Sequence, residues 1–160
     1  MKIEYANISQ LDDIMSIYST AQDFMAKVGN PNQWKKVYPS RQIIKQDILN
    51  ANLYVCLENN TICGVFCFTI ANDSTYSYII GKWLNEDKYG VIHRLASSQT
   101  SKGVAKACLE FCFDKIKNIR VDTHKDNMVM QNLFAKFGFT YCGIIFLADG
   151  QERLAYQKQQ

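Results

Sequence analysis

Residues 90–137 switch repeatedly between two hydrophobic periodicities, and this order of elements constrains the fold more than any other feature. Residues 90–96 and 119–123 are short, mainly apolar runs that are typical of buried strands. Residues 103–117 and 127–137 instead repeat their apolar side chains at helical spacing. A strand–helix–strand unit of this kind favours two parallel strands joined by a right-handed crossover.

The N-terminal part of the chain predicts a short strand followed by two helices. Residues 2–6 have strand character, and Ser9 followed by Asp12 has the spacing of a capping box at a helix start. Apolar residues then recur at helical spacing until Gly-Asn-Pro at residues 29–31 ends the helix. Ser40 is predicted to cap a second, shorter helix.

Two hairpins complete the expected sheet. Residues 53–57 and 62–70 are strand-like and are joined by a polar turn, and a connector rich in tyrosine follows at residues 72–87. Residues 139–147 and 153–156 form a last hairpin around Asp-Gly. The elements together predict an α+β fold, with helices flanking a mixed sheet that is mostly antiparallel but contains one parallel pair.

Composition supports a single globular domain over residues 1–160, with 48% hydrophobic and 21% charged side chains and no linker or repeat. The net charge of +3 is dispersed along the chain, so no nucleic-acid partner is expected. The apolar stretches are far shorter than the roughly 20 residues of a membrane helix, and the first residues lack a signal-peptide core. We therefore expect a soluble, cytoplasmic protein without a membrane partner.

Six cysteines raise the question of a metal site or of disulfide bonds. No C-x-x-C pair is present, and His93 and His124 do not stand at a spacing typical of zinc ligands. In a chain without a secretion signal, most cysteines are small buried hydrophobic residues. We expect buried thiols and no metal.

A polar loop joins strand to helix within the parallel unit and offers a seat for a phosphate group. Gly103 and Ala105 leave the backbone of the helix start uncovered, and Lys102 and Lys106 add positive charge. The free N–H groups of a helix N-terminus favour phosphate or pyrophosphate. Neither the nucleotide-hydrolase loop nor the dinucleotide-binding glycine pattern is present.

The ordered set of strand, K-G-V-A loop, helix, strand, Asn127, helix and Gly-Phe resembles the GCN5-related N-acetyltransferase (GNAT) superfamily, and in particular one bacterial branch of it. That family binds coenzyme A through a loop of the form [Arg/Gln]-x-x-Gly-x-[Gly/Ala]. Gly103 and Ala105 match the glycine and the small residue, whereas Thr100 stands where Arg or Gln is usual.

The resemblance implies an enzyme that moves an acetyl group from acetyl-coenzyme A (acetyl-CoA), its co-substrate, directly to a primary amine of a small molecule or peptide. The residues implied to bind acetyl-CoA lie on the strand edge, at the helix start and on the following helix. They are Leu95, Ala96 and Ser97 for the pantetheine arm, Lys102, Gly103, Val104, Ala105 and Lys106 for the diphosphate, and Asn127 and Phe134 beyond them.

Two histidines are candidate general bases, because an amine with an ordinary pKa of about 10.4 must lose a proton before it attacks. His93 is the first candidate, since alternation along the strand gives it the parity of Leu95 and Ser97 and therefore the face of the cofactor. His124, at the carboxyl end of the next strand, is the second, and its alternative role is to cap the following turn.

The acid that protonates the departing thiolate is a separate question. The family often uses a tyrosine in the helix after Asn127, but Phe134 stands there and has no proton to give. Tyr141 and Cys142 are candidate replacements. A backbone N–H of residues 95–97 is expected to hold the oxyanion.

Aromatic residues in irregular segments are candidates for the acceptor site. Gln33, Trp34 and Tyr38 lie between the first two helices, where the family admits its acceptor, and Trp83 lies in the connector before the strand of His93. Packing of these loops onto the body of the protein is the alternative for all four.

Two other functions compete with the enzyme. Phe134 favours a non-catalytic acyl-CoA-binding protein of the same fold, whereas the dispersed charge disfavours a nucleic-acid or interaction module. The late hairpin is expected to present an exposed edge that would allow a homodimer.

Overall fold

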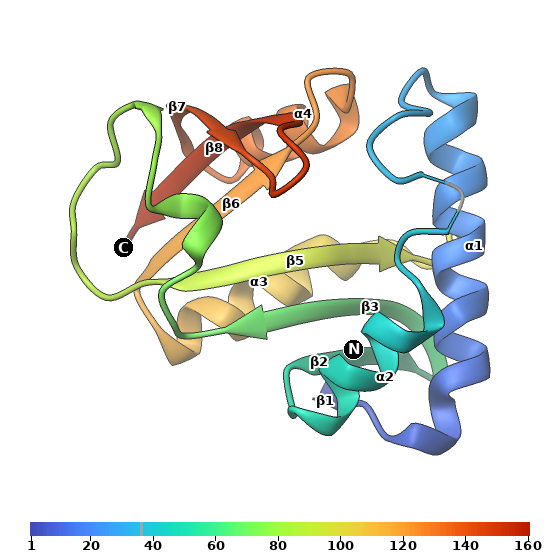
Figure 1. Ribbon diagram of the computed structural model, residues 1–160. Helices are drawn as coiled ribbons and strands as arrows, with labels where there is room; N and C mark the ends of the chain where they lie inside the picture. The colour runs from blue at the N-terminus through green and yellow to red at the C-terminus, as the bar shows by residue number, and fades with distance from the viewer. Residues whose placement is uncertain (36) are drawn as a thin grey trace.

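In the computed structural model, which describes residues 1–35 and 37–160, eight strands form one mixed sheet in the order β1-β2-β3-β5-β6-β8-β7-β4 (Figure 1). In chain order the strands are β1 (Lys2–Tyr5), β2 (Leu53–Glu58), β3 (Thr61–Thr69), β4 (Ile80–Gly81), β5 (Gly90–Ser97), β6 (Asn118–Thr123), β7 (Thr140–Phe146) and β8 (Glu152–Gln159). Only β5 and β6 are parallel, and the remaining neighbours are antiparallel. The predicted α+β architecture is confirmed.

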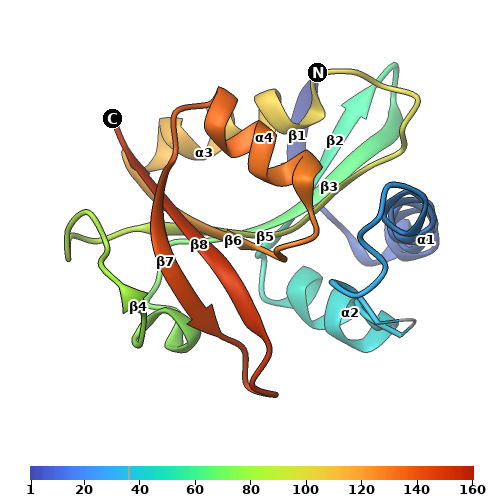
Figure 2. The same ribbon diagram turned by 90° about the horizontal axis from the view of Figure 1, so that it is seen from above.

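Helices cover both faces of this sheet. The helices α1 (Leu11–Lys27) and α2 (Arg41–Leu49) lie on one face, and α3 (Val104–Lys115) and α4 (Met128–Lys136) lie on the other (Figure 2). Each side has its own hydrophobic cluster, one under α3 and α4 and one under α1 and α2. Among the described residues, no helix is long and apolar enough to cross a membrane.

The parallel pair is short, and this shortness positions the site. Gly90 pairs with Ile119 and Val91 with Arg120, and no register continues beyond them. Figure 1 shows the two strands fanning apart toward their carboxyl ends, so that the sheet opens between them. Backbone groups in such an opening need another partner, because a buried N–H or C=O group is costly when unpaired.

The start of α1 differs from the prediction. Asn7, rather than Ser9, is the capping residue, and it caps a 3₁₀ turn (Ile8–Gln10) that precedes α1. The Asn7 side chain accepts from the Ser9 N–H at 3.0 Å, and the Gln10 side chain accepts from the Asn7 N–H at 2.9 Å. The capping box therefore exists, but it begins two residues earlier. The predicted cap at Ser40 is confirmed, since its hydroxyl accepts from the Ile43 N–H at 3.2 Å.

The connector between β3 and β5 contains β4, which the sequence did not predict because two residues show no periodicity. Glycine is required where β4 pairs with β7, since a Cβ on Gly81 would lie 2.2 Å from the Cys142 carbonyl oxygen. Likewise a Cβ on Gly143 would lie 2.1 Å from the Ile80 oxygen. The two backbones touch, and this contact holds the connector against the sheet.

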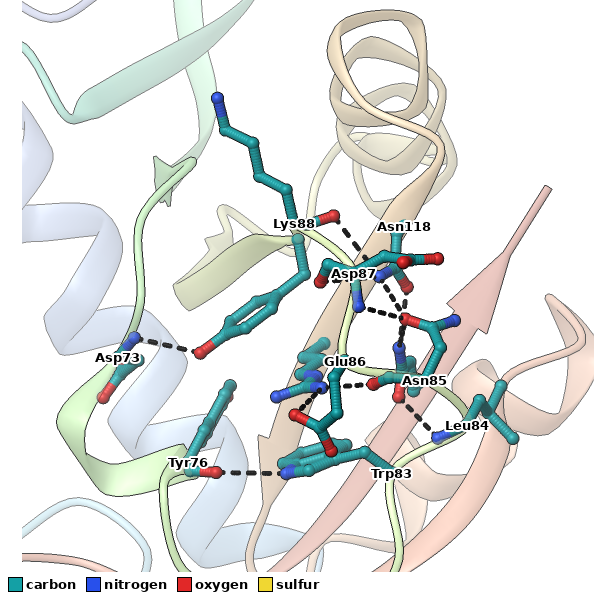
Figure 3. A network of polar contacts seen from close by, with 12 residues as sticks. Asp73, Tyr76, Trp83, Leu84, Asn85, Glu86, Asp87, Lys88 and Asn118 are labelled. Atoms are coloured by element: carbon teal, nitrogen blue, oxygen red, sulfur yellow. Dashed lines mark hydrogen bonds and ion pairs between the residues drawn. The ribbon is translucent and has the colours of Figure 1, made fainter.

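A buried polar network fixes the rest of the connector (Figure 3). The Asn118 amide donates to the Asn85 side chain at 2.8 Å and accepts from Gln157 at 2.7 Å. The Arg120 guanidinium lies 4.2 Å from the ring centroid of Trp83 and 4.0 Å from that of Tyr89, a geometry typical of cation–π contacts. These contacts tie the connector to β6 and β8 and thereby position the segment that precedes β5.

We predict that Asn118→Ala destabilises the fold by about 1–3 kcal/mol, because it leaves buried polar partners of the connector unpaired. Urea denaturation measures the change in the free energy of unfolding. Asn132→Ala is the matched control: Asn132 is exposed on α4, and its removal should change stability by no more than about 0.5 kcal/mol. Equal stability of the two variants would contradict a structural role for the network.

Candidate functional site

A cavity of about 600 Å³ passes through the opening between β5 and β6 and reaches both faces of the sheet. Its volume lies within the usual range for small-molecule sites. We call its two parts the α1 half and the α3 half. The α1 half is lined by residues that include Phe24, Trp34, Tyr38, Asp73, His93 and Asp122. The α3 half is lined by residues that include Ser97, Val104, Ala105, Leu109, Met130 and Phe134.

A β-bulge in β5 changes which residues face the cavity halves. Val65 pairs with Ala96 and Cys67 with His93, so one residue of β3 faces two residues of β5. Arg94 within this bulge has φ of 52°, a left-handed conformation that is uncommon for any residue other than glycine. Such a conformation persists only where surrounding contacts impose it.

The bulge corrects the predicted parity of His93. Cross-strand partners share a face, so His93 and Ala96 lie on the α1 side with Cys67 and Val65. Leu95 packs instead against the cluster on the α3 side. The simple alternation that grouped His93 with Leu95 and Ser97 is therefore wrong, because the extra residue shifts it by one.

A buried ion pair holds the bulge. The Arg94 guanidinium lies 2.6 Å from the Asp47 carboxylate of α2 and donates to the Tyr38 hydroxyl at 3.2 Å. The Tyr18 hydroxyl of α1 donates to the Arg94 carbonyl at 3.0 Å. Burial alone would lower the pKa of Arg94, but Tyr38, Cys67 and Asp47 raise it above its ordinary value. Arg94 therefore stays charged and links both helices of this face to the strand.

His93 lies between two carboxylates. Its Nε2 is 2.7 Å from Asp73 Oδ2, and its Nδ1 is 3.9 Å from Asp122 Oδ2. Asp122 in turn accepts from the buried Tyr76 hydroxyl at 2.7 Å. The imidazole is thus held from its Nε2 side, as in sites where a carboxylate orients a histidine that moves protons.

Asp73 is itself held in place by its neighbours. Its Oδ1 accepts from the Thr75 N–H and hydroxyl at 2.9 and 2.6 Å, and its own N–H donates to Tyr89 at 3.1 Å. Burial alone would raise the pKa of Asp73, but the hydrogen bonds from His93 and Thr75 hold it well below its ordinary value. Asp73 is therefore ionised at neutral pH and can stabilise a protonated His93.

The start of α3 borders the α3 half and has the features of an anion-binding site. Gly103 precedes the helix with φ of 84°, and no side chain caps this end. The first helical hydrogen bond runs from Ala107 N–H to Gly103 C=O, which leaves the preceding N–H groups without a partner in the helix. A Cβ at Gly103 would meet open space, so the approach to these amides is clear.

The predicted cofactor residues fall into two groups. Leu95, Ala96, Ser97, Val104, Ala105, Asn127 and Phe134 line the cavity. Lys102, Gly103 and Lys106 lie at the helix start outside this lining, and Lys106 Nζ is 3.6 Å from the exposed Glu110 carboxylate. Phe134 is buried, with its ring 5.5 Å from that of Phe139.

Asn127 is engaged within the protein, in contrast to the expected contact with the cofactor. Its Oδ1 caps α4 by accepting from the Met130 N–H at 3.1 Å, and its Nδ2 donates to Gln33 Oε1 at 2.7 Å. The same Gln33 oxygen accepts from Asn30 at 2.9 Å. Gln33 therefore joins the segment between α1 and α2 to the start of α4, while its side chain still lines the cavity.

Four other predicted site residues also lie outside the cavity lining. His124 Nδ1 accepts a hydrogen bond from the Asp126 N–H at 3.1 Å, so His124 takes its alternative role and caps the turn. Its burial, and secondly the positive charge of Arg153, lower the pKa of His124. Tyr141 is 52% exposed and packs on Tyr156. Cys142 and Trp83 are buried in the cluster beneath the connector, where burial raises the pKa of Cys142.

Trp83 thus packs the connector onto the body, since its Nε1 donates to the Tyr76 carbonyl at 3.1 Å. The predicted acid–base role of Tyr141 and the predicted acceptor contact of Trp83 are corrected by this placement. Both expectations followed from chain position alone, and the topology carries these residues away from the opening between β5 and β6.

Sequence reasoning missed several charged residues that line the cavity, among them Asp73, Asp122, Arg94 and Arg153. Asp122 and Arg94 belong to strands with clear patterns, and a charged residue inside an apolar run was the signal that could have identified them. Asp73 had no such signal, because its connector is polar throughout. Among the described residues, no group of three or more His, Cys, Asp or Glu side chains could hold a metal ion.

Comparison with known proteins gives one family. Residues 12–139 match the acetyltransferase (GNAT) family. An acetyltransferase of the GNAT family from Streptococcus agalactiae 2603 is 33% identical, with a TM-score of 0.90 over 99% of this chain and 95% of that chain. A candidate acetyltransferase from Staphylococcus aureus Mu50 is 28% identical, with a TM-score of 0.74 over 99% of each chain.

A ribosomal-protein-alanine N-acetyltransferase from Brucella melitensis is 16% identical, with a TM-score of 0.68 over 100% of each chain, and shows similarity of fold alone. None of the curated proteins matches the chain.

We predict that Asp47→Ala costs about 3–5 kcal/mol of unfolding free energy, because it leaves the buried Arg94 charge without its carboxylate. Both side chains of this pair are only 14% exposed. The matched control is Asp12→Ala, since Asp12 also lies 2.6 Å from an arginine, but in a pair that is mainly exposed. Its loss should cost less than about 1 kcal/mol in the same denaturation experiment. Equal costs would remove the ion pair as the support of the bulge.

Proposed function

The chain belongs to the acetyltransferase (GNAT) family, and on this basis we propose that it transfers an acetyl group from acetyl-CoA directly to the primary amine of a small molecule or peptide. The observation that carries the proposal is the continuous cavity, which joins the open start of α3 to His93 through the sheet. A phosphate-bearing carrier on one face and an amine on the other would meet in the opening between β5 and β6.

The α3 half fits the carrier. The N–H groups at the start of α3 would hold the diphosphate, with Lys102 and Lys106 nearby as additional positive charge. Ser97, Val104 and Ala105 line the path from this point into the sheet and would contact the arm of the carrier. Acetyl-CoA supplies the acetyl group as a thioester, which amines attack once they are neutral.

His93 is the proposed general base. It would take the proton of the incoming ammonium, either directly or through one water molecule. Asp73, 2.7 Å away, would fix the orientation of the ring. Asp122 and the Tyr76 hydroxyl would complete the polar surroundings on the other side of the imidazole.

The departing sulfur does not require Tyr141, Cys142 or a tyrosine at position 134. Phe134 lines the cavity and has no proton to donate. A thiol has an ordinary pKa of about 8.5, so a thiolate is a competent leaving group and can take up its proton from water afterwards. Protonated His93 would then release its proton to solvent, which returns the base to its starting state.

The second candidate is an acyl-CoA-binding protein without catalysis, which the phenylalanine at position 134 favours. The two functions differ in one observable: the enzyme releases free coenzyme A when amines are added, and the binding protein does not. A thiol dye follows this release.

We predict that Ala105→Glu weakens coenzyme A binding at least tenfold, because it places a carboxylate where the diphosphate should lie. The same charge at the first turn of α3 favours the helix, so the fold should keep its stability. Calorimetry with coenzyme A measures the affinity. The control is Ala107→Glu, whose side chain does not line the cavity and should leave the affinity nearly unchanged. Undiminished binding to the Ala105 variant would place the diphosphate elsewhere.

We predict that His93→Gln lowers kcat at least about tenfold near pH 7, since glutamine cannot accept the proton. His124→Gln is the matched control, because His124 does not line the cavity, and it should keep most of the rate. Asp73→Asn should also lower kcat, because the carboxylate that orients the imidazole is replaced by an amide. Unchanged rates and profiles in the His93 variant would exclude it as the base.

A further inference from the structure

The α1 half of the cavity has an apolar wall. Ala21, Phe24 and Met25 of α1 and Val28, which directly follows the helix, recur at helical spacing, and all four line the cavity. Trp34 faces them from the segment between α1 and α2, where its ring lies 5.7 Å from that of Tyr18. Such a wall favours an apolar group, because covering it removes apolar surface from water.

The inner end of the same half is polar and negatively charged. The Asp73 and Asp122 carboxylates flank His93 there, and Arg153 is the cation next to Asp122. Two carboxylates and one guanidinium meet at this end, so acidic side chains outnumber the arginine there. An ammonium group is therefore attracted to the place where its proton is to be removed.

The cations of the α1 half that the structure describes already have partners. Arg94 is paired with Asp47 at 2.6 Å, and Lys35 lies 3.5 Å from Asp149. Buried Arg153 donates to the carbonyls of Gln33 and Glu152 at 3.1 and 2.9 Å. A carboxylate on the acceptor would also lie near the carboxylates of Asp73 and Asp122 beside His93, and this repulsion disfavours amino acids.

A bridge of contacts limits the size of the acceptor. Gln33 accepts hydrogen bonds from Asn127 and, through its carbonyl, from Arg153, so the segment between α1 and α2 is tied to the start of α4 and to β8. The ion pair between Lys35 and Asp149 is a second contact, which joins the same segment to the turn between β7 and β8. The cavity of about 600 Å³ is also shared with the arm of the carrier. This leaves space for a small molecule rather than for a peptide segment.

We infer that the acceptor is a small, singly charged primary amine with an apolar or aromatic body and no carboxylate. The ammonium lies beside His93 Nδ1 and the Asp122 carboxylate, and the apolar body lies against Phe24, Met25 and Trp34. This inference rests on the proposed function, since it names the acceptor of the same reaction. In that reaction the amine nitrogen forms a bond to the acetyl carbon, the thioester C–S bond breaks, and one ammonium proton goes to His93.

The test compares matched amines with acetyl-CoA and the unmodified protein. We expect kcat/KM for 2-phenylethylamine to exceed that for ethylamine, which lacks the apolar body, and that for phenylalanine, which adds the carboxylate, each by at least about tenfold. Spermidine and a peptide with a free N-terminus complete the panel. A preference for phenylalanine, spermidine or the peptide would overturn the acceptor class while leaving the proposed function intact. Acetylation of no amine in the panel would overturn both.

A variant links the preference to the wall. Phe24→Gln keeps a side chain of similar length but removes the apolar ring, so the ratio of kcat/KM between 2-phenylethylamine and ethylamine should fall at least fivefold. Lys27→Gln is the control on the same helix, since Lys27 is exposed and does not line the cavity, and its ratio should stay that of the unmodified protein. An unchanged ratio in the Phe24 variant would overturn the assignment of the wall.

Discussion

Strand β5 is hydrogen-bonded to its parallel neighbour over only two residue pairs, and the site depends on this early separation. Had the ladder continued, the sheet would divide the α1 side from the α3 side, and a carrier on one face could not reach an amine on the other. The bulge at Arg94 follows His93 and bends β5 there, so that His93 faces the α1 side while Leu95 faces the α3 side. Because Arg94 adopts an unfavourable backbone conformation, the contacts with Asp47, Tyr38 and Tyr18 are what keep the opening in one shape.

Long periodic segments made the order and type of most elements predictable, since apolar spacing reports directly on which face is buried. Prediction failed where periodicity is too short or is interrupted. The two-residue strand β4 has no pattern, and β8 extends beyond the predicted strand because fully buried Gln157 looks like a surface residue in the sequence. The parity of His93 failed because no glycine marks the bulge. Its partner Asp73 could not be identified at all, since only the folded connector brings the two together.

Two residues with an implied role toward the cofactor, Phe134 and Asn127, are engaged in contacts within the protein. Phe134 packs against the rings of Phe139 and Tyr156. The side-chain oxygen of Asn127 caps α4, and its side-chain nitrogen donates to Gln33. The α4 region is thus built as a rigid wall, whereas the groups able to exchange protons gather on the opposite side around His93. This division matches the balance of the reaction, in which the amine must lose a proton and the sulfur can leave without one.

All six cysteines are buried, and they are spread over the three hydrophobic clusters. Cys108 lies under α3, Cys67 lies on the side of α1, and Cys142 lies beneath the connector. A sulfhydryl reagent can reach each one only when its own layer opens. Peptide-resolved alkylation rates would therefore report separately on the opening of each layer, which gives this protein native, unengineered reporters of its internal dynamics.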